Sequence, residues 1–235
     1  MLDLLIRRLR MSSSAPRGCT NGRRCYSGRY RNGKAVYFYN ESDNRRIYCG
    51  RFWFRRKNQS PPHGRTVETV SGCFADNRRT GKWHFSKKSH GYRQKLVAEY
   101  ASGCRNGAYR YTAVCWQHSL GVTPGLTSMR MTMADNHPAG SIECRIGKEK
   151  ITGGYDGDGR PDGVWMMDST KTETYKTFHE KWEHGVCVES YSYDDSTGER
   201  IAVRSQLPDI VTSMIMGECR PLESIIKRGL PDTDA

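Results

Sequence analysis

A Gly-x-aromatic motif that recurs along the chain constrains the fold more than any other feature. Copies begin at Gly28, Gly50 and Gly72, with 22 residues between successive glycines, and Gly81 and Gly103 are again 22 apart. A fixed period of this length is typical of repeat arrays, in which each repeat packs on its neighbours. We expect the glycine to supply a bend or a left-handed backbone and the aromatic to pack on the next copy. The motif residues are Gly28, Tyr30, Gly50, Phe52, Gly72, Phe74, Gly81, Trp83, Gly103, Gly107, Tyr109, Gly163 and Trp165.

The clearest copy lies at residues 99–111 and predicts a β-hairpin. Asn106-Gly107 tolerates positive φ at both positions, which predicts a tight turn there. After it, Tyr109 and Tyr111 point to one face of a strand, and Arg110 to the other. The chain has 24 Gly, and its 13 Tyr outnumber its 6 Phe. This composition favours many short strands with tight turns over helical packing.

The order of these signals predicts three segments. We expect residues 1–24 to be flexible and residues 25–203 to form a mainly β fold, an elongated antiparallel sheet of successive hairpins. Residues 204–235 carry proline and glycine at the positions that begin and end helices. They predict short C-terminal helices, which would cap the open edge of the sheet, and a tail.

The copies at residues 26–33 and 99–111 resemble MORN-type repeats of bacterial proteins, including the YwqK-type antitoxin group. The resemblance covers roughly residues 25 to 200, and the copy at Gly50-Arg51-Phe52 departs from it by lacking the second glycine. It implies an elongated antiparallel sheet and a scaffold, partner-binding or membrane-associated role. No catalytic residue is implied by it.

The formal net charge of +13 allows two interpretations. Arginines and lysines, dense at residues 51–57 and 78–88, can form the solvated faces of half-buried strands. They can also attract the phosphates of nucleic acid or of anionic lipid, and the interleaved Tyr and Trp would suit base stacking. Gathering of the cations on one sheet face would favour the second interpretation. No apolar run is long enough to span a bilayer.

The most site-like stretch is the Asp-Gly-rich segment 156–163. Asp156, Asp158 and Asp162 are candidate oxygen ligands for Ca²⁺, a hard cation that takes six to eight of them. Arg160 stands at the next alternate position, and Asp-Gly-rich hairpins more often use these residues as turn formers. We therefore predict no metal site and keep the three aspartates as the calcium candidate.

No set of catalytic residues emerges from the remaining motifs. His179 and His184 flank Trp182 with glutamates beside them, and a His–Glu pair can do acid–base work. No nucleophile motif, phosphate loop or dinucleotide fingerprint accompanies them. The sequence predicts a protein that is not an enzyme and needs no cofactor.

Cysteine usage gives neither a disulfide framework nor a zinc site. Nine cysteines cannot all pair within the chain, and no four have zinc-ligand spacing. Cys73 and Cys104 stand where Arg29 and Arg51 stand in other copies, so we interpret most cysteines as incidental, in a reducing or undetermined compartment. The default expectation is a cytoplasmic protein, or a secreted or envelope-associated one if the true N-terminus differs.

The leading functional hypothesis is a non-enzymatic repeat scaffold that presents a broad surface to an as yet unknown protein partner. The first alternative is a basic surface that binds anionic membrane lipid or nucleic acid. The second is an antitoxin-like partner of a toxin, which rests on the resemblance alone.

Overall fold

The computed structural model describes residues 24–30, 33–43, 45–60, 64–116, 125–168, 177–194, 197–204, 207–228 and 230. The expected N-terminal segment, apart from Arg24, and the end of the tail lie outside this range. The strands are β1 (Arg24–Tyr30), β2 (Gly33–Ser42), β3 (Arg45–Ser60), β4 (Gly64–Ala75), β5 (Arg78–Ser89), β6 (Tyr92–Ala101), β7 (Cys104–Cys115), β8 (Gly125–Ala134), β9 (His137–Ile146), β10 (Glu149–Tyr155), β11 (Gly163–Asp168), β12 (Thr177–Glu183), β13 (Val186–Tyr193) and β14 (Arg200–Ala202).

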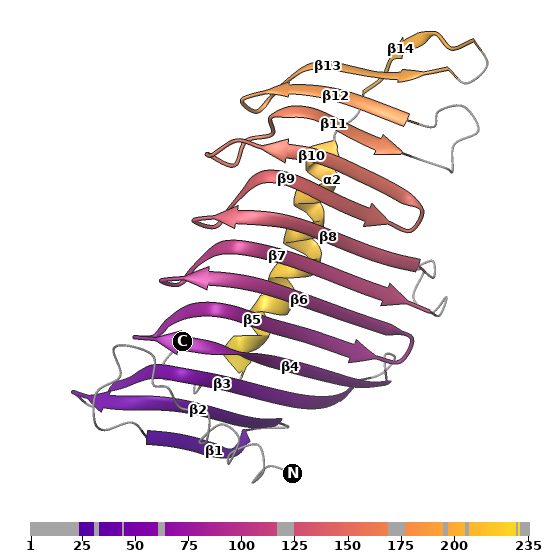
Figure 1. Ribbon diagram of the computed structural model, residues 1–235. Coiled ribbons are helices and arrows are strands. Elements are labelled where there is room, and N and C mark those ends of the chain that lie inside the picture. Colours follow the sequence, from indigo (N-terminus) through magenta and orange to yellow (C-terminus); the bar gives the residue numbers. More distant parts are fainter. Residues whose placement is uncertain are drawn as a thin grey trace. The chain divides into compact units, whose positions relative to one another are not determined.

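The strands follow one another in the sheet in the order of the chain, without a crossover (Figure 1). The described pairs, such as β1 with β2 and β3 with β4, are antiparallel. The predicted mainly β fold of successive hairpins with a short helical C-terminal segment is therefore confirmed. The chain divides into two compact units. The first holds Met1–His90, Val97–Cys104 and Leu222–Ala235, and the second holds Gly91–Leu96 and Arg105–Pro221.

The core of the first unit is a row of aromatic rings on one face of its strands. Ring centroids lie 5.4 Å apart for Tyr37 and Tyr48, and 5.6 Å apart for Tyr48 and Phe74. Trp83 follows at 5.0 Å from Phe74 and at 6.3 Å from Tyr100. All five side chains are buried. Phe74 and Trp83, the two motif aromatics of this row, thus lie at neighbouring positions across strands, where ring pairs stabilise a sheet.

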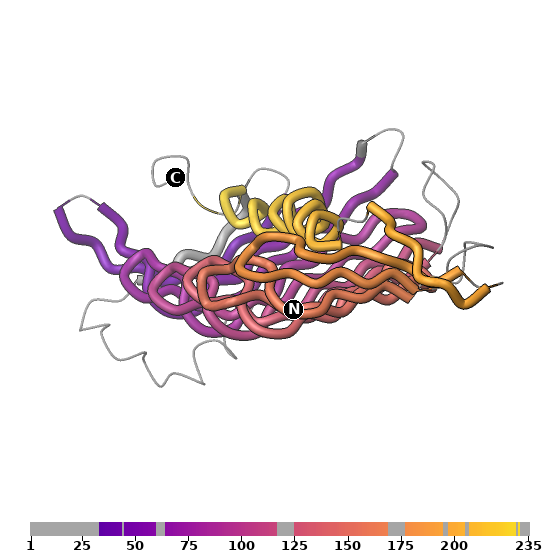
Figure 2. The backbone as a smooth tube through the Cα atoms, turned by 90° about the horizontal axis from the view of Figure 1, so that it is seen from above, coloured from indigo at the N-terminus to yellow at the C-terminus, as the bar shows by residue number. Residues whose placement is uncertain are grey.

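The core of the second unit is built from one sheet face and a helix. Tyr111, Met129 and Trp165 are fully buried on that face. Helix α2 (Leu207–Met214) lies on one side of these strands (Figure 2) and buries Leu207 and Val211. Because alternate residues of a strand point to opposite faces, each strand of this unit gives one row to the core and one row to the outer face.

The helical segment continues past α2 with a change of pitch. It runs through the π-helical turn η1 (Ile215–Cys219), helix α3 (Arg220–Glu223) and the 3₁₀ turn η2 (Ser224–Arg228). The Arg220 amide donates to the Ile215 carbonyl, one residue farther back than in an α-helix. Pro221 follows directly and has no amide hydrogen to donate to the preceding turn, a common cause of such local widening of a helix.

The helical segment packs on a sheet face, which corrects the expectation that it caps an open edge. Its Glu218 carboxylate accepts hydrogen bonds from Tyr92 (3.1 Å), Tyr111 (2.9 Å) and Gln94 in β6 and β7. Farther along, Arg228 donates to both Glu68 carboxylate oxygens in β4, at 2.7 and 2.8 Å. These partners lie in the middle of the strand order. These polar contacts, together with the burial of Leu207 and Val211, hold the helical segment on the sheet face. Within the part of the chain that the structure describes, no helix is both long and apolar enough to cross a membrane.

The turn of the clearest hairpin lies at Ser102-Gly103, so the prediction of a turn at Asn106-Gly107 is wrong. Ser102 and Gly103 have φ of 50° and 92°, whereas Gly107, with φ of 110°, lies inside β7. The Gly103 amide donates to the Arg79 carbonyl at the preceding turn, 2.9 Å away. This bond between successive turns outweighs the local preference of Asn-Gly for a turn.

Two tryptophans pack over glycines in the same way, one in each unit. The Trp83 ring covers Gly72 and the Trp165 ring covers Gly153, so closely that a Cβ atom at either glycine would overlap the indole. Each indole N–H donates to the carbonyl of the residue after its glycine, at 3.2 Å to Cys73 and 3.1 Å to Gly154. Both glycines are needed here because they have no side chain, and neither has a positive φ.

Candidate functional site

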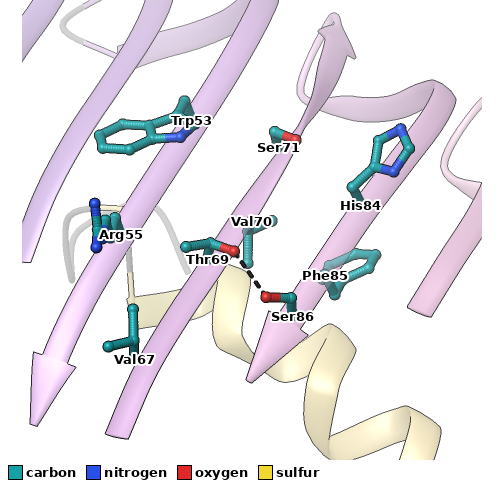
Figure 3. A pocket seen from close by; sticks show the side chains of 9 residues that line it. All are labelled: Trp53, Arg55, Val67, Thr69, Val70, Ser71, His84, Phe85 and Ser86. Carbon is teal, nitrogen blue, oxygen red and sulfur yellow. Dashed lines mark hydrogen bonds between the residues drawn. The ribbon is translucent and has the colours of Figure 1, made fainter. Parts of the chain in front are cut away.

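The candidate site is a shallow groove on the outer face of β3, β4 and β5, the face opposite the aromatic core of the first unit. Its volume is about 270 Å³. The side chains that line it on this face are Trp53, Arg55, Val67, Thr69, Ser71, His84 and Ser86 (Figure 3). Val70 and Phe85 also border it, but their side chains are buried on the core face.

Strand alternation and register bring these residues together. Trp53 pairs with Ser71, which pairs with His84, so the three lie in one row across the strands. Arg55, Thr69 and Ser86 form the next row. Because neighbouring strands are about 4.8 Å apart, each row is only about 10 Å wide.

The middle of the groove is low and polar. Ser71 and Thr69 are small, and the Thr69 and Ser86 hydroxyls lie 3.1 Å apart in a hydrogen bond (Figure 3). In the neighbouring row, Trp53 and His84 lie on either side of Ser71, and His84 is exposed (Figure 3). The groove therefore offers aromatic rings beside hydroxyl groups on an otherwise flat sheet.

Exposed cations surround the groove on the same face. The registers of β2 to β5 place a series of exposed cationic side chains here. Glu99 is the acidic side chain on this face among the described side chains of the first unit, and it lies 3.5 Å from Lys82 in an ion pair. The face therefore carries a strong excess of positive charge. These cations include Lys34, Arg51, Arg55, Lys57, Arg65, Arg78, Lys82 and Lys88.

Cations on the core face have structural partners instead. Arg79 donates to the Tyr100 hydroxyl at 2.7 Å and lies over its ring. Arg46 lies over the Tyr39 ring, and Arg56 donates to Asn58 at 2.7 Å. Arg79 and Arg46 thus join neighbouring strands, whereas the outer-face cations are exposed and, among them, Lys82 pairs with Glu99. Charge alone, read from the sequence, does not separate these two groups.

The three calcium candidates do not converge on one point. Asp156 Oδ1 accepts the amides of Asp158 at 2.9 Å and Arg160 at 2.8 Å. The Arg160 amide is the main reason that the pKa of Asp156 lies below its ordinary value. Asp162 instead accepts the His184 amide at 3.2 Å. The described residues contain no group of three or more His, Cys, Asp or Glu side chains placed to hold a metal ion. Asp156 serves as a turn former.

The histidines near Trp182 are not placed for acid–base chemistry with Glu180. His179 is on the outer face, stacked on Tyr191 with ring centroids 4.9 Å apart. Glu180 is buried on the opposite face, where it accepts the Leu207 amide. His184 lies in a turn, 3.6 Å from Asp156. Adjacent strand residues point in opposite directions, so their closeness in sequence does not bring them together.

Sequence reasoning missed the buried polar residues. Glu68, Gln94 and Glu180 are buried, and each has a partner in or next to the helical segment or in a neighbouring strand. The one available signal was their position in the apolar row of an alternating strand.

Burial, together with the Glu218 charge, raises the pKa of Tyr92 and of Tyr111. Burial raises the pKa of the Cys144 thiol to about 12, which suits a packing role.

A scan against protein-family models finds no model that matches this chain. A search of curated proteins likewise finds no match. The resemblance to MORN-type repeats therefore stays a prediction, and the function must be argued from the site itself.

Proposed function

We propose that this chain is a non-enzymatic binding protein that binds single-stranded nucleic acid through the outer face of its first unit. The observation that carries the proposal is the difference between the two faces. The core-face arginines described above have structural partners, whereas exposed cations surround the outer-face groove. Positive faces of this kind attract phosphates through counterion release.

The groove favours nucleic acid over an anionic membrane. Trp53 offers a ring on which a base can stack, and the Thr69 and Ser86 hydroxyls can bond to sugar or phosphate oxygens. Membrane surfaces are held by exposed apolar side chains together with cations. Among the described side chains of the first unit, no large hydrophobic one is exposed. A single strand fits better than a duplex because its bases are free to stack.

We expect a fluorescein-labelled 15-nucleotide oligothymidylate to bind, more weakly as the salt concentration rises. The triple variant Arg55→Gln, Lys57→Gln, Lys88→Gln removes three phosphate contacts. Each phosphate contact adds about 0.7 to the magnitude of the slope of log affinity against log salt concentration. The loss of three contacts should therefore reduce that magnitude by about 2. Affinity at low salt should fall at least tenfold. Fluorescence anisotropy at 50 to 200 mM NaCl measures both.

The matched control removes the same charge from the second unit, at Arg130, Arg145 and Lys148, which are exposed. It should change the affinity by less than threefold, because a charge outside the groove acts only through the screened field. Equal losses in both triple variants, or no binding at 50 mM NaCl, would show that the groove is not the site. Binding to phosphatidylserine vesicles without binding to the oligonucleotide would show that the ligand of this face is an anionic membrane and not nucleic acid.

Protein binding is a second candidate function, favoured by apolar side chains on the second unit. Val164 and Val186 are 60% and 63% exposed and point to the same outer face at one end of β11 to β13. Apolar side chains gathered on one exposed face are typical of protein interaction sites. They lie in the second unit, whereas the cationic groove lies in the first.

If this second candidate is right, the double variant Val164→Lys, Val186→Lys should lose a partner that the wild-type chain captures from its native host. Oligonucleotide affinity should stay within threefold of wild type. Capture at equal yield by both proteins, measured by quantitative mass spectrometry, would contradict it.

A further inference from the structure

The second unit contains a larger cavity, of about 430 Å³, beside the helical segment. One wall is the helical segment from Pro208 to Arg220, and the other is a row of hairpin turns that join the strands at one end. Its size is within the range of small-molecule sites. It lies wholly within residues of the second unit and is separate from the outer-face groove.

The helical wall is fixed at both ends. Asp209, Thr212 and Arg220 line the cavity, and about 1.5 Å of rise per residue gives this wall a length of about 17 Å. At its start, the Leu207 amide donates to Glu180. Near its end, Glu218 accepts the Tyr111 hydroxyl. The wall therefore has a definite position relative to β7 and β12.

The wall of turns is rigid as well. The Asn136 amide donates to the Arg105 carbonyl at 3.0 Å, and the Gly185 amide donates to the Pro161 carbonyl at 2.8 Å. Gly159 has φ of 79° and lies so close to His137 that a Cβ atom would be 2.8 Å from the His137 Cβ. Successive turns are thus tied to one another, and the cavity is preformed.

The floor of the cavity combines apolar side chains with the buried hydroxyl of Tyr155. Met133 and Tyr155 are 2% and 8% exposed, and Trp182 is half-buried. Met216, on the helical wall, is 47% exposed and adds apolar surface at the opening. A ligand with an apolar body would bury the exposed surface of Met216 and of Trp182, which is favourable, and would pack against Met133 and Tyr155.

The two ends of the cavity differ in charge. Arg105 is the second residue of β7, the strand whose Tyr111 bonds Glu218, and Arg220 follows Glu218 by two residues. These two arginines therefore lie at the same end. Asp209 lies at the other end, two residues after the Leu207 amide that Glu180 of β12 accepts. A carboxylate is attracted to the arginine end, where guanidinium groups can bind it, and repelled from the aspartate end.

We propose that this cavity binds an amphipathic monocarboxylate of the fatty-acid class. Its carboxylate lies between Arg105 and Arg220, and its acyl chain lies over Met133 and Tyr155 toward Trp182. The charge difference between the two ends sets the direction, and the apolar side chains of the floor select a chain over a small polar anion.

Isothermal titration with decanoate tests this proposal on the full chain. One decanoate should bind per protein, and the variants Arg105→Gln and Arg220→Gln should each weaken binding about tenfold. Decan-1-ol, which has the same chain without the charge, should bind at least tenfold more weakly than decanoate to the wild type. The affinity for decan-1-ol should be nearly the same in the two arginine variants as in the wild type.

Two further variants keep the result interpretable. Arg145→Gln removes an exposed cation from the outer face of the same unit and should leave decanoate affinity within twofold. Thr212→Phe fills the cavity from an exposed helix position and should abolish binding while the thermal midpoint is retained. Absence of one-to-one binding at millimolar decanoate would overturn the proposal. So would equal affinity for decanoate and decan-1-ol, or affinities that neither arginine variant changes.

Discussion

Gly153→Ala is expected to lower the free energy of unfolding by about 3 kcal/mol, the upper end of the usual range for overpacking a core. The new methyl group would overlap the Trp165 ring. That ring cannot move aside easily, because it is fully buried and its N–H donates to the Gly154 carbonyl. For a chain of this size the change corresponds to a fall of about 6 to 12 °C in Tm, which calorimetry measures.

A matched control for this variant is Gly157→Ala. A Cβ atom at Gly157 would have no neighbouring atom within 4 Å, and the φ of Gly157 is not positive, so the change should stay within about 0.5 kcal/mol. Adding Trp165→Leu to Gly153→Ala removes the overlap, so the double variant should lose less than the sum of the two single losses. Equal Tm values for the Gly153 and Gly157 variants would contradict close packing of Trp165 on Gly153.

The alternation of aromatic and polar residues was enough to predict the hairpins and much of the core. Trp83, Tyr109 and Trp165 are each fully buried at the aromatic position of the motif. The role of Gly72 and Gly153 could not be predicted. It depends on which residue lies opposite on the next strand, and a bulge between Ser71 and Cys73 changes that register.

The candidate site was partly predictable for the same reason. Alternation places Arg55 and Lys57 on the face opposite Phe54, as the sequence suggested. The groove between Trp53 and His84 needs the pairing of three strands, which only the fold supplies. The cavity beside the helical segment was less predictable still. Its two walls include Arg105 and Arg220, which are more than about 100 positions apart in the sequence and are brought together only by the fold.

Glu180 is expected to be the most sensitive polar residue of the second unit. Its carboxylate is 1% exposed, and it accepts the Leu207 amide at 3.2 and 3.3 Å and the Trp182 indole N–H at 2.7 Å. Glu180→Ala leaves both donors without this acceptor. At about 1 to 3 kcal/mol for each unsatisfied group, the free energy of unfolding should fall by about 4 kcal/mol.

The position of Glu180 predicts where the damage appears. Leu207 begins helix α2, and a carboxylate at a helix start satisfies an amide that has no partner within the helix. Hydrogen exchange in Glu180→Ala should therefore speed up over residues 207–219 more than in β3 and β4. Glu180→Gln keeps one carbonyl acceptor and should have about half the effect. Glu183→Ala removes an exposed ion pair with Lys181, 2.9 Å long, and should change stability by less than about 1 kcal/mol. If exchange in α2 is the same in the Glu180 and Glu183 variants, the helix is held by apolar burial alone.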